Sequence, residues 1–128
     1  MKPFDWEDYL AFAEDLQNNR ADDAALRSAV SRAYYAAYNL AVRFLENRHL
    51  AVTSFGNKHA AVWNEFQRGP GKDWKAVYKI GDSLKKRRVD ADYFLTQKKW
   101  TEEVKVAIAE AKHIQHWLRQ IANQQPSA

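Results

Sequence analysis

A group of residues that could bind a phosphate lies around Arg88. Gly81 and Leu84 precede it by seven and four positions, so on a helix Arg88 continues their apolar face. A guanidinium on an inner face needs a partner, because burying an unpaired charge is costly. Asp92 follows one helical turn later, with Tyr93 beside it. The spacing predicts either a charge clamp at the end of a helix or an electropositive pocket whose arginine holds a phosphate.

A second polar group lies on the preceding long helix that the sequence predicts. At 100° per residue, four side chains fall within an arc of about 80° opposite the apolar stripe. These residues are Arg32, Tyr35, Asn39 and Arg43. Two arginines, an amide and a phenol suit a phosphate-rich ligand or a partner subunit that accepts their hydrogen bonds. The strip could equally be a solvated face with two ordinary surface arginines, and the sequence leaves both interpretations open.

Further bases accompany these groups. Lys58 and His59 open a predicted helix, where together they could help to bind an anion. The three residues before Arg88 turn away from its side toward the rim of the predicted pocket. They are Lys85, Lys86 and Arg87. We therefore group Lys58 and these three bases with the second polar group as predicted contacts to nucleic acid or nucleotide.

Charge is unevenly distributed along the 128 residues, whose net charge is +4. Residues 1–23 contain two bases and seven acids, whereas residues 72–100 contain nine bases and four acids. A basic segment attracts nucleic acid or nucleotides by neutralising phosphates. Alternatively, the acidic and basic segments face one another within the fold or across a dimer.

Several classes of site are excluded or disfavoured. The chain has no cysteine, so disulfides and thiolate chemistry are absent. His113 and His116 have a spacing that two metal ligands can use, but no further ligand pattern completes a site, so we predict a solvated helix face and no metal. No glycine-rich phosphate loop or other cofactor motif occurs. Without a signal peptide or a stretch of about 20 apolar residues, the chain is predicted to be cytoplasmic, with no membrane partner.

Helices must position these residues, since the sequence has no β-alternating run and its few prolines and glycines cluster at breaks. We predict helices from about 4 to 18, from 22 or 23 to 48, from an N-cap at Asn57 to about 67, from a cap at Asp73 onward, and from Thr101 onward. The expected inner faces comprise Leu26, Val30, Ala33, Ala37, Leu40, Ala41 and Phe44, then Trp74, Val77, Gly81 and Leu84, and finally Val104, Ala107, Ala111, Ile114, Leu118 and Ile121. The fold class is therefore all-α: an antiparallel four- to five-helix up-and-down bundle, with one domain over residues 1–124 and a disordered tail at 125–128.

Three segments resemble small prokaryotic proteins of the HEPN family. Residues 31–38, Ser-Arg-Ala-Tyr-Tyr-Ala-Ala-Tyr, are similar to the SRAYYAAF stretch of those proteins. Lys58-His59 fits the Lys/Ser-His that opens their next helix, and residues 88–93 match their R-x-x-A-D-Y segment. The resemblance covers nearly the whole chain. It implies a HEPN-like bundle that forms a homodimer, often encoded near a minimal nucleotidyltransferase or in a defence or toxin–antitoxin locus.

The resemblance also implies chemistry. Many HEPN proteins are metal-independent endoribonucleases that use an Arg followed four to six residues later by a His. In this chain Asp92 and Tyr93 stand in that interval, and His59 is the histidine that the fold would have to bring to Arg88. We thus expect an RNA- or nucleotide-binding component of a toxin–antitoxin or defence system, with RNase activity through Arg88, Asp92, Tyr93 and His59 left open. The alternative is a non-catalytic dimeric interaction module that docks a nucleotidyltransferase or another partner.

Overall fold

The computed structural model describes residues 2–50, 58–95 and 97–124. Within these residues the chain forms five α-helices and no strand. They are α1 (Glu7–Asn19), α2 (Asp23–Asn47), α3 (Lys58–Gln67), α4 (Lys72–Tyr93) and α5 (Trp100–Asn123). The predicted all-α class is confirmed, and the helices pack into a bundle.

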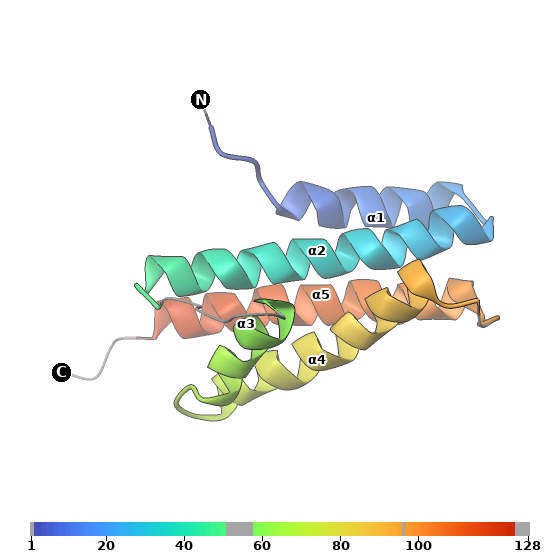
Figure 1. The fold of residues 1–128 in the computed structure, drawn as a ribbon. Helices are drawn as coiled ribbons and strands as arrows, with labels where there is room; N and C mark the ends of the chain where they lie inside the picture. The colour runs from blue at the N-terminus through green and yellow to red at the C-terminus, as the bar shows by residue number, and fades with distance from the viewer. Residues whose placement is uncertain (1, 51–57, 96, 125–128) are drawn as a thin grey trace.

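The helices are arranged around α2 and α5 (Figure 1). α2 packs against α1, α5 and α4, while α5 also contacts α4, and the short α3 packs mainly on α4. Followed from blue to red, α1 and α4 run in one direction and α2 and α5 in the other (Figure 1). α2 is therefore the element that touches every other helix and can bring residues from several of them together.

The buried side chains form one contiguous core. All the inner-face residues predicted for α4 and α5 are buried, and so are five of the seven predicted for α2. Leu40 and Phe44 are half-buried and pack against the edge of the core. Periodicity alone located these faces, because the apolar stripe of an amphipathic helix turns toward its neighbours.

The predicted cap of α4 is wrong. Gly71, not Asp73, is the N-cap, and its φ of 89° lies in the left-handed region that favours glycine. Asp73 lies in the first turn, where an acid suits the positive end of the helix dipole. Its carboxylate accepts a hydrogen bond of 2.7 Å from the side chain of Gln124.

The other helix boundaries lie within three residues of the predictions, and the predicted end of α3 at about residue 67 is confirmed. α1 begins at Glu7 rather than near Phe4, after a turn in which the Asp5 carboxylate accepts a hydrogen bond of 2.9 Å from the Glu7 amide. α5 begins at Trp100, one residue before the predicted Thr101. The predicted N-cap Asn57 and the predicted tail lie outside the described residues.

α3 and α4 approach closely at Gly81. A Cβ atom added there would lie 2.2 Å from Cε3 of Trp63, far inside van der Waals contact. Because Trp63 is fully buried, its ring cannot simply swing away. Glycine at this position therefore lets α3 lie against α4, and α3 begins with the Lys58-His59 pair.

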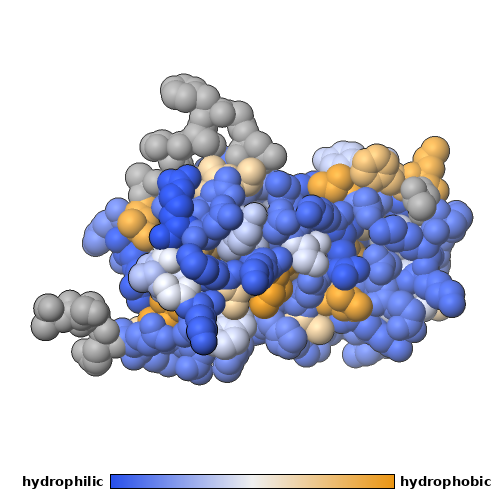
Figure 2. Space-filling model, turned by 90° about the horizontal axis from the view of Figure 1, so that it is seen from below, coloured by the Kyte–Doolittle hydropathy of each residue, from blue (hydrophilic) through white to orange (hydrophobic). Residues whose placement is uncertain are grey.

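The surface is mostly polar, with a small apolar area at one end. Figure 2 shows hydrophilic residues over most of the face seen from below, and orange residues gathered at the end where α4 leads toward α5. Tyr93, Phe94 and Leu95 are exposed in that segment, Leu95 to 94%. No helix in the described part of the chain is long and apolar enough to cross a membrane.

Candidate functional site

Arg88 lies at the centre of a cluster formed by α2, α3 and α4. It is only 8% exposed, which confirms the prediction that it continues the apolar face of α4. Its guanidinium carbon lies 5.2 Å from the ring centroid of Tyr34, 5.5 Å from that of Tyr35 and 5.8 Å from that of Tyr93. These rings attract the cation through their π faces, so aromatic contacts partly compensate its burial.

None of the described residues accepts a hydrogen bond from Arg88. Its Nη1 atom lies 3.7 Å from Oδ2 of Asp92, close enough for an ion pair but too far for a hydrogen bond. Its Nε–H is buried with no partner, and within the described residues the guanidinium makes no hydrogen bond. An arginine offers five N–H donors in a planar fork. Such a set of unpaired donors is rare in a protein interior and suits a ligand that accepts several hydrogen bonds.

Ser31 holds the carboxylate that faces Arg88. Its hydroxyl donates a hydrogen bond of 3.1 Å to Oδ2 of Asp92, the same oxygen that faces the guanidinium. Ser31 is itself buried on α2. Arg88, Asp92 and Tyr93 thus form one group, as their spacing predicts, and Tyr93 is its exposed member at 71%.

The structure brings His59 to the same group through Tyr34. The Tyr34 hydroxyl lies 2.7 Å from Nδ1 of His59, and the Trp63 indole N–H donates to the Tyr34 oxygen at 3.2 Å. Because the indole N–H can only donate, the proton of the buried Tyr34 hydroxyl is best directed at Nδ1 of His59. This assignment places the imidazole proton on Nε2, which makes no hydrogen bond within the described part of the chain.

The imidazole of His59 packs against tyrosine rings and lies near positively charged side chains. It stacks on Tyr38, with ring centroids 4.2 Å apart, and meets Tyr35 edge-on at 5.9 Å. Burial lowers the pKa of His59 below its usual 6.5, and the charges of Arg88, Lys85 and Lys58 lower it further. The neutral form of the ring is therefore favoured at pH 7.

Tyr34 connects the two halves of the site. Burial raises its pKa well above the usual 10, and the hydrogen bond from Trp63 and the nearby charge of Arg88 offset only part of that shift. The hydroxyl consequently stays protonated throughout the physiological range. Tyr34 contacts Arg88 with its ring and His59 with its hydroxyl, so it fixes the separation of the guanidinium and the imidazole.

Arg27 on α2 fixes the end of α4 that bears Arg88 and Asp92. It donates to the carbonyl oxygens of Ala91 at 2.8 Å and Asp90 at 3.1 Å, and also to that of Phe94. Its guanidinium carbon lies 4.7 Å from the Trp100 ring centroid. Carbonyls in the last turn of a helix lack the usual amide four residues on. Arg27 supplies donors there, in addition to the Phe94 amide that donates to Asp90, and ties α4 to α2.

Two of the predicted bases lie away from this group. Arg87 points to α5, where it donates to Glu110 at 2.7 Å and to Glu103 at 3.2 Å. Lys86 is exposed and forms an ion pair of 3.0 Å with Asp82. Both charges are thus largely neutralised by carboxylates of the same chain. These carboxylates lie on α4 and α5 and not in residues 1–23, so the pairs are not the contact between acidic and basic segments that the alternative explanation of the charge pattern proposes.

The polar strip predicted on α2 does not form one outward surface. Arg32 lies over the Tyr9 ring of α1, with its guanidinium carbon 5.1 Å from the centroid. Tyr35 packs against the core and Arg88, and Asn39 donates to the Tyr35 carbonyl at 2.8 Å. The prediction of a shared surface is wrong because α2 is surrounded by helices, so one polar face meets different neighbours.

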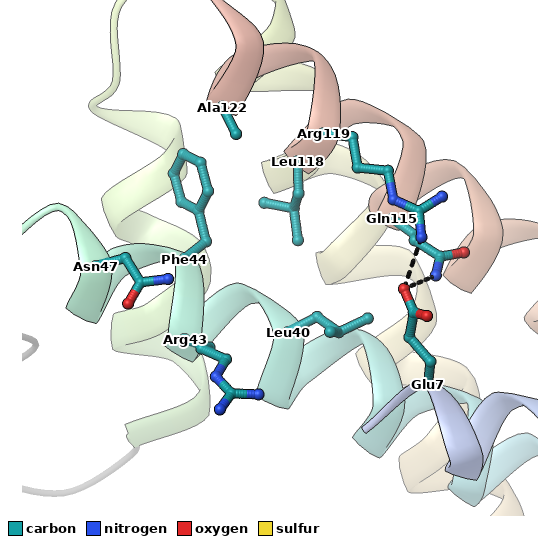
Figure 3. Close-up of a pocket in the computed structure, with 9 residues that line it drawn as sticks. All are labelled: Glu7, Leu40, Arg43, Phe44, Asn47, Gln115, Leu118, Arg119 and Ala122. Atoms are coloured by element: carbon teal, nitrogen blue, oxygen red, sulfur yellow. Dashed lines mark hydrogen bonds and ion pairs between the residues drawn. The ribbon is translucent and has the colours of Figure 1, made fainter. Parts of the chain in front are cut away.

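Arg43, the last member of that strip, borders a separate cavity of about 190 Å³ (Figure 3). Leu40, Phe44 and Leu118 form apolar lining between α2 and α5. At its edge the Glu7 carboxylate accepts hydrogen bonds from Arg119, at 2.7 Å, and from Gln115. Arg43 reaches this cavity and not the Arg88 group, so the two predicted binding regions are distinct.

Sequence reasoning missed four residues of the site: Ser31, Tyr34, Tyr38 and Trp63. Tyr34 and Tyr38 stand four residues apart within an alanine-rich packing face. That spacing places two hydroxyls on one side of a helix. It is the sequence feature from which the two tyrosines could have been predicted as site residues. Trp63 and Ser31 gave no comparable signal, because their roles depend on contacts between helices.

No metal centre is found in the described part of the chain, where no group of three or more His, Asp or Glu residues converges. His113 and His116 are exposed on α5, so the predicted solvated helix face is confirmed.

Comparisons with protein-family models, with curated proteins and with solved structures found no match for this chain. The likeness to HEPN proteins rests on the three sequence segments alone.

Proposed function

We propose that this chain is a HEPN-type protein that binds RNA or a nucleotide through a phosphate held by Arg88. A phosphate bears several acceptor oxygens in an arrangement that matches the guanidinium fork. In the context implied by the sequence resemblance, the protein acts as a homodimer in a defence or toxin–antitoxin system.

The observation that carries this proposal is the buried guanidinium with no hydrogen bond among the described residues. Leaving buried charged donors unpaired costs about 1–3 kcal/mol or more. A bound phosphate would supply the missing acceptors. Lys58 and Lys85 support the proposal, because their charges act on His59 and so lie near the same group. Neither lysine forms an ion pair within the described residues.

The same group offers a route to metal-independent RNA cleavage. If Nδ1–H of His59 donates to the Tyr34 oxygen, Nε2 has a lone pair and can accept the ribose 2′-hydroxyl proton. The 2′-oxygen then bonds to phosphorus and the bond to the 5′-oxygen breaks, leaving a 2′,3′-cyclic phosphate. The 5′-oxygen takes a proton from water, and the hydroxide left behind takes the proton that Nε2 of His59 had accepted, which restores the neutral imidazole. Arg88 stabilises the charge on the phosphorane. This step needs the less favoured tautomer of His59, so we expect cleavage to be slow compared with binding.

The test compares Arg88→Met with Arg87→Met, a matched pair that preserves side-chain volume. Binding of a fluorescein-labelled RNA is followed by anisotropy, and cleavage is followed on gels in EDTA. We expect Arg88→Met to weaken binding at least tenfold and to abolish any cleavage, with Arg87→Met close to wild type. Binding should also weaken steeply as salt increases. Equal binding by both variants, or no RNA binding by the wild type, would contradict the proposal.

A second candidate function is a non-catalytic dimeric module that docks a nucleotidyltransferase or another protein. It is favoured by the exposed run Tyr93, Phe94 and Leu95, since contiguous exposed apolar residues often mark protein interfaces. Leu95→Glu should then reduce the mass measured by light scattering or prevent capture of an adjacently encoded nucleotidyltransferase. An unchanged mass and unchanged capture would count against it.

A further inference from the structure

We propose that Asp92 binds the 2′-hydroxyl of a ribose whose phosphate is held by Arg88, so that the site selects ribonucleotides over deoxyribonucleotides. This inference rests on the proposed function, because it requires a phosphate at Arg88. It goes further by assigning a specificity residue and the sugar class of the ligand.

The first support is the geometry of the carboxylate. Oδ2 of Asp92 accepts the hydrogen bond from Ser31 and faces Arg88 at 3.7 Å. Oδ1 makes no hydrogen bond or ion pair within the described residues. The Asp92 side chain is 30% exposed, whereas that of Arg88 is 9% exposed. A ligand that approaches the guanidinium from solvent would therefore meet the carboxylate at the mouth of the site.

The second support is electrostatic. A carboxylate within 4 Å of the guanidinium repels any phosphate that binds there. A site for a bare anion gains nothing from such a group. The repulsion is offset if the ligand also bears a hydroxyl that donates to the carboxylate. In RNA the 2′-hydroxyl is on the carbon next to the one that bears the 3′-phosphate, so it can reach Oδ1 while the phosphate contacts Arg88.

Ser31 makes the arrangement specific. Its hydroxyl donates to Oδ2, the oxygen that faces Arg88, which leaves Oδ1 as the acceptor for a ligand. An acidic side chain that accepts from a ribose hydroxyl is a recurrent device in nucleotide-binding proteins. The 2′-hydroxyl is also the group by which proteins distinguish RNA from DNA.

The experiment measures the affinity of the full chain for three 5′-fluorescein-labelled octamers: uridine, 2′-deoxyuridine and 2′-O-methyluridine. The methylated octamer retains an oxygen at C2′ but cannot donate a hydrogen bond. We expect wild-type protein to bind the uridine octamer about tenfold more tightly than either of the others. If gels show cleavage, the His59→Ala variant replaces wild type as the background for all three probes.

Variants assign the preference to Asp92. Asp92→Ala should reduce the ratio of affinities to nearly one, mainly by strengthening binding of the deoxyuridine octamer as the repulsion is lost. Ser31→Ala should reduce the ratio partly. Asp90→Asn is the matched control, because Asp90 lies on the same helix but pairs with Lys98 at 2.5 Å, and it should leave the ratio unchanged.

The outcomes separate this inference from the function on which it rests. If all three octamers bind equally and Arg88→Met weakens each of them, the phosphate site stands and the role of Asp92 is wrong. A uridine preference that persists in Asp92→Ala also overturns it. If no octamer binds, both the inference and the proposed function fail.

Discussion

Arg87 and Arg88 are neighbours on α4 with the same chemistry and opposite surroundings. Arg87 faces α5, where Glu103 and Glu110 accept its hydrogen bonds at 3.2 and 2.7 Å. Arg88 faces α2 and α3 and is more deeply buried. It has three tyrosine rings and a carboxylate at 3.7 Å as neighbours, and none of the described residues accepts a hydrogen bond from it. The α5 side of the helix is thus a completed ion-pair network. The α2–α3 side is a cluster whose strongest donors are still unused.

The difference shows what burial of a charge indicates. A buried arginine whose donors are all matched is fully explained by its contribution to the fold. A buried arginine without hydrogen bonds is not explained in this way, because no hydrogen bond offsets the free-energy cost of removing its charge from water. Burial separates the two residues only by degree, whereas the hydrogen bonds show which of them is already satisfied by the fold.

The largest effect is expected where the α2–α3 side is assembled. Gly81→Ala places a methyl group on the buried Trp63 ring, and such overpacking costs about 3 kcal/mol, partly offset by better helix propensity. We expect the melting temperature to fall by roughly 10 °C. The Trp63 indole N–H resonance should shift as its bond to Tyr34 is lost.

Ser83→Ala is the control, on the same helix and only half-buried. A Gly81→Ala protein with an unchanged melting temperature would show that α3 and α4 are less tightly packed than the contact at Gly81 indicates.

The comparison itself is tested by replacing each arginine with methionine. Arg87→Met leaves Glu110 without its cation and Glu103 with only Lys98 at 3.6 Å, so we expect a loss of about 2 kcal/mol in the free energy of unfolding. Arg88→Met replaces an incompletely paired charge with an apolar chain of similar volume and should be neutral or stabilising. Unfolding in urea measures the free energy of unfolding of both variants. Equal destabilisation by the two variants would favour the charge-clamp interpretation of Arg88.

A smaller effect is expected at the hydroxyl that links the two halves of the site. Tyr34→Phe removes the acceptor of the Trp63 N–H and the partner of His59, and leaves a buried donor unpaired at a cost of about 1–2 kcal/mol. The His59 resonances should broaden as its ring gains freedom. Tyr9→Phe is the control, since Tyr9 lies on α1 against Arg32. Sharp, unshifted His59 resonances in Tyr34→Phe would show that the ring is held by stacking alone.

The smallest effect concerns pH. The pKa of His59 is lower in the folded protein than the usual 6.5, so the unfolded chain binds a proton more readily. The resulting stability is fully present above pH 6.5 and is lost as the pH falls through the folded pKa. We expect a decrease below about 1 kcal/mol, because His59 is only half-buried. The free energy of unfolding of wild type and His59→Gln, measured in urea between pH 5 and 7.5, tests this decrease. If it changes with pH to the same extent in both proteins, His59 is excluded as the cause.

Much of the fold could be predicted from the sequence. The number of helices, their approximate limits and their buried faces follow from apolar residues at helical spacing, which act within one element. The burial of Arg88 followed in the same way from Gly81 and Leu84. The start of α4 could not be predicted as well, because Asp73 and Gly71 are both plausible caps and the backbone conformation at Gly71 decided between them.

The sequence by itself determined that Arg88, Asp92 and Tyr93 lie together, because they are within two turns of one helix. Only the tertiary structure decided that His59 joins them through Tyr34 and that Arg87 does not. It also decided that Arg32 and Arg43 lie elsewhere. The physical reason is that helical periodicity fixes the direction of a side chain from its own helix. Which helix stands in that direction depends on how the whole bundle packs.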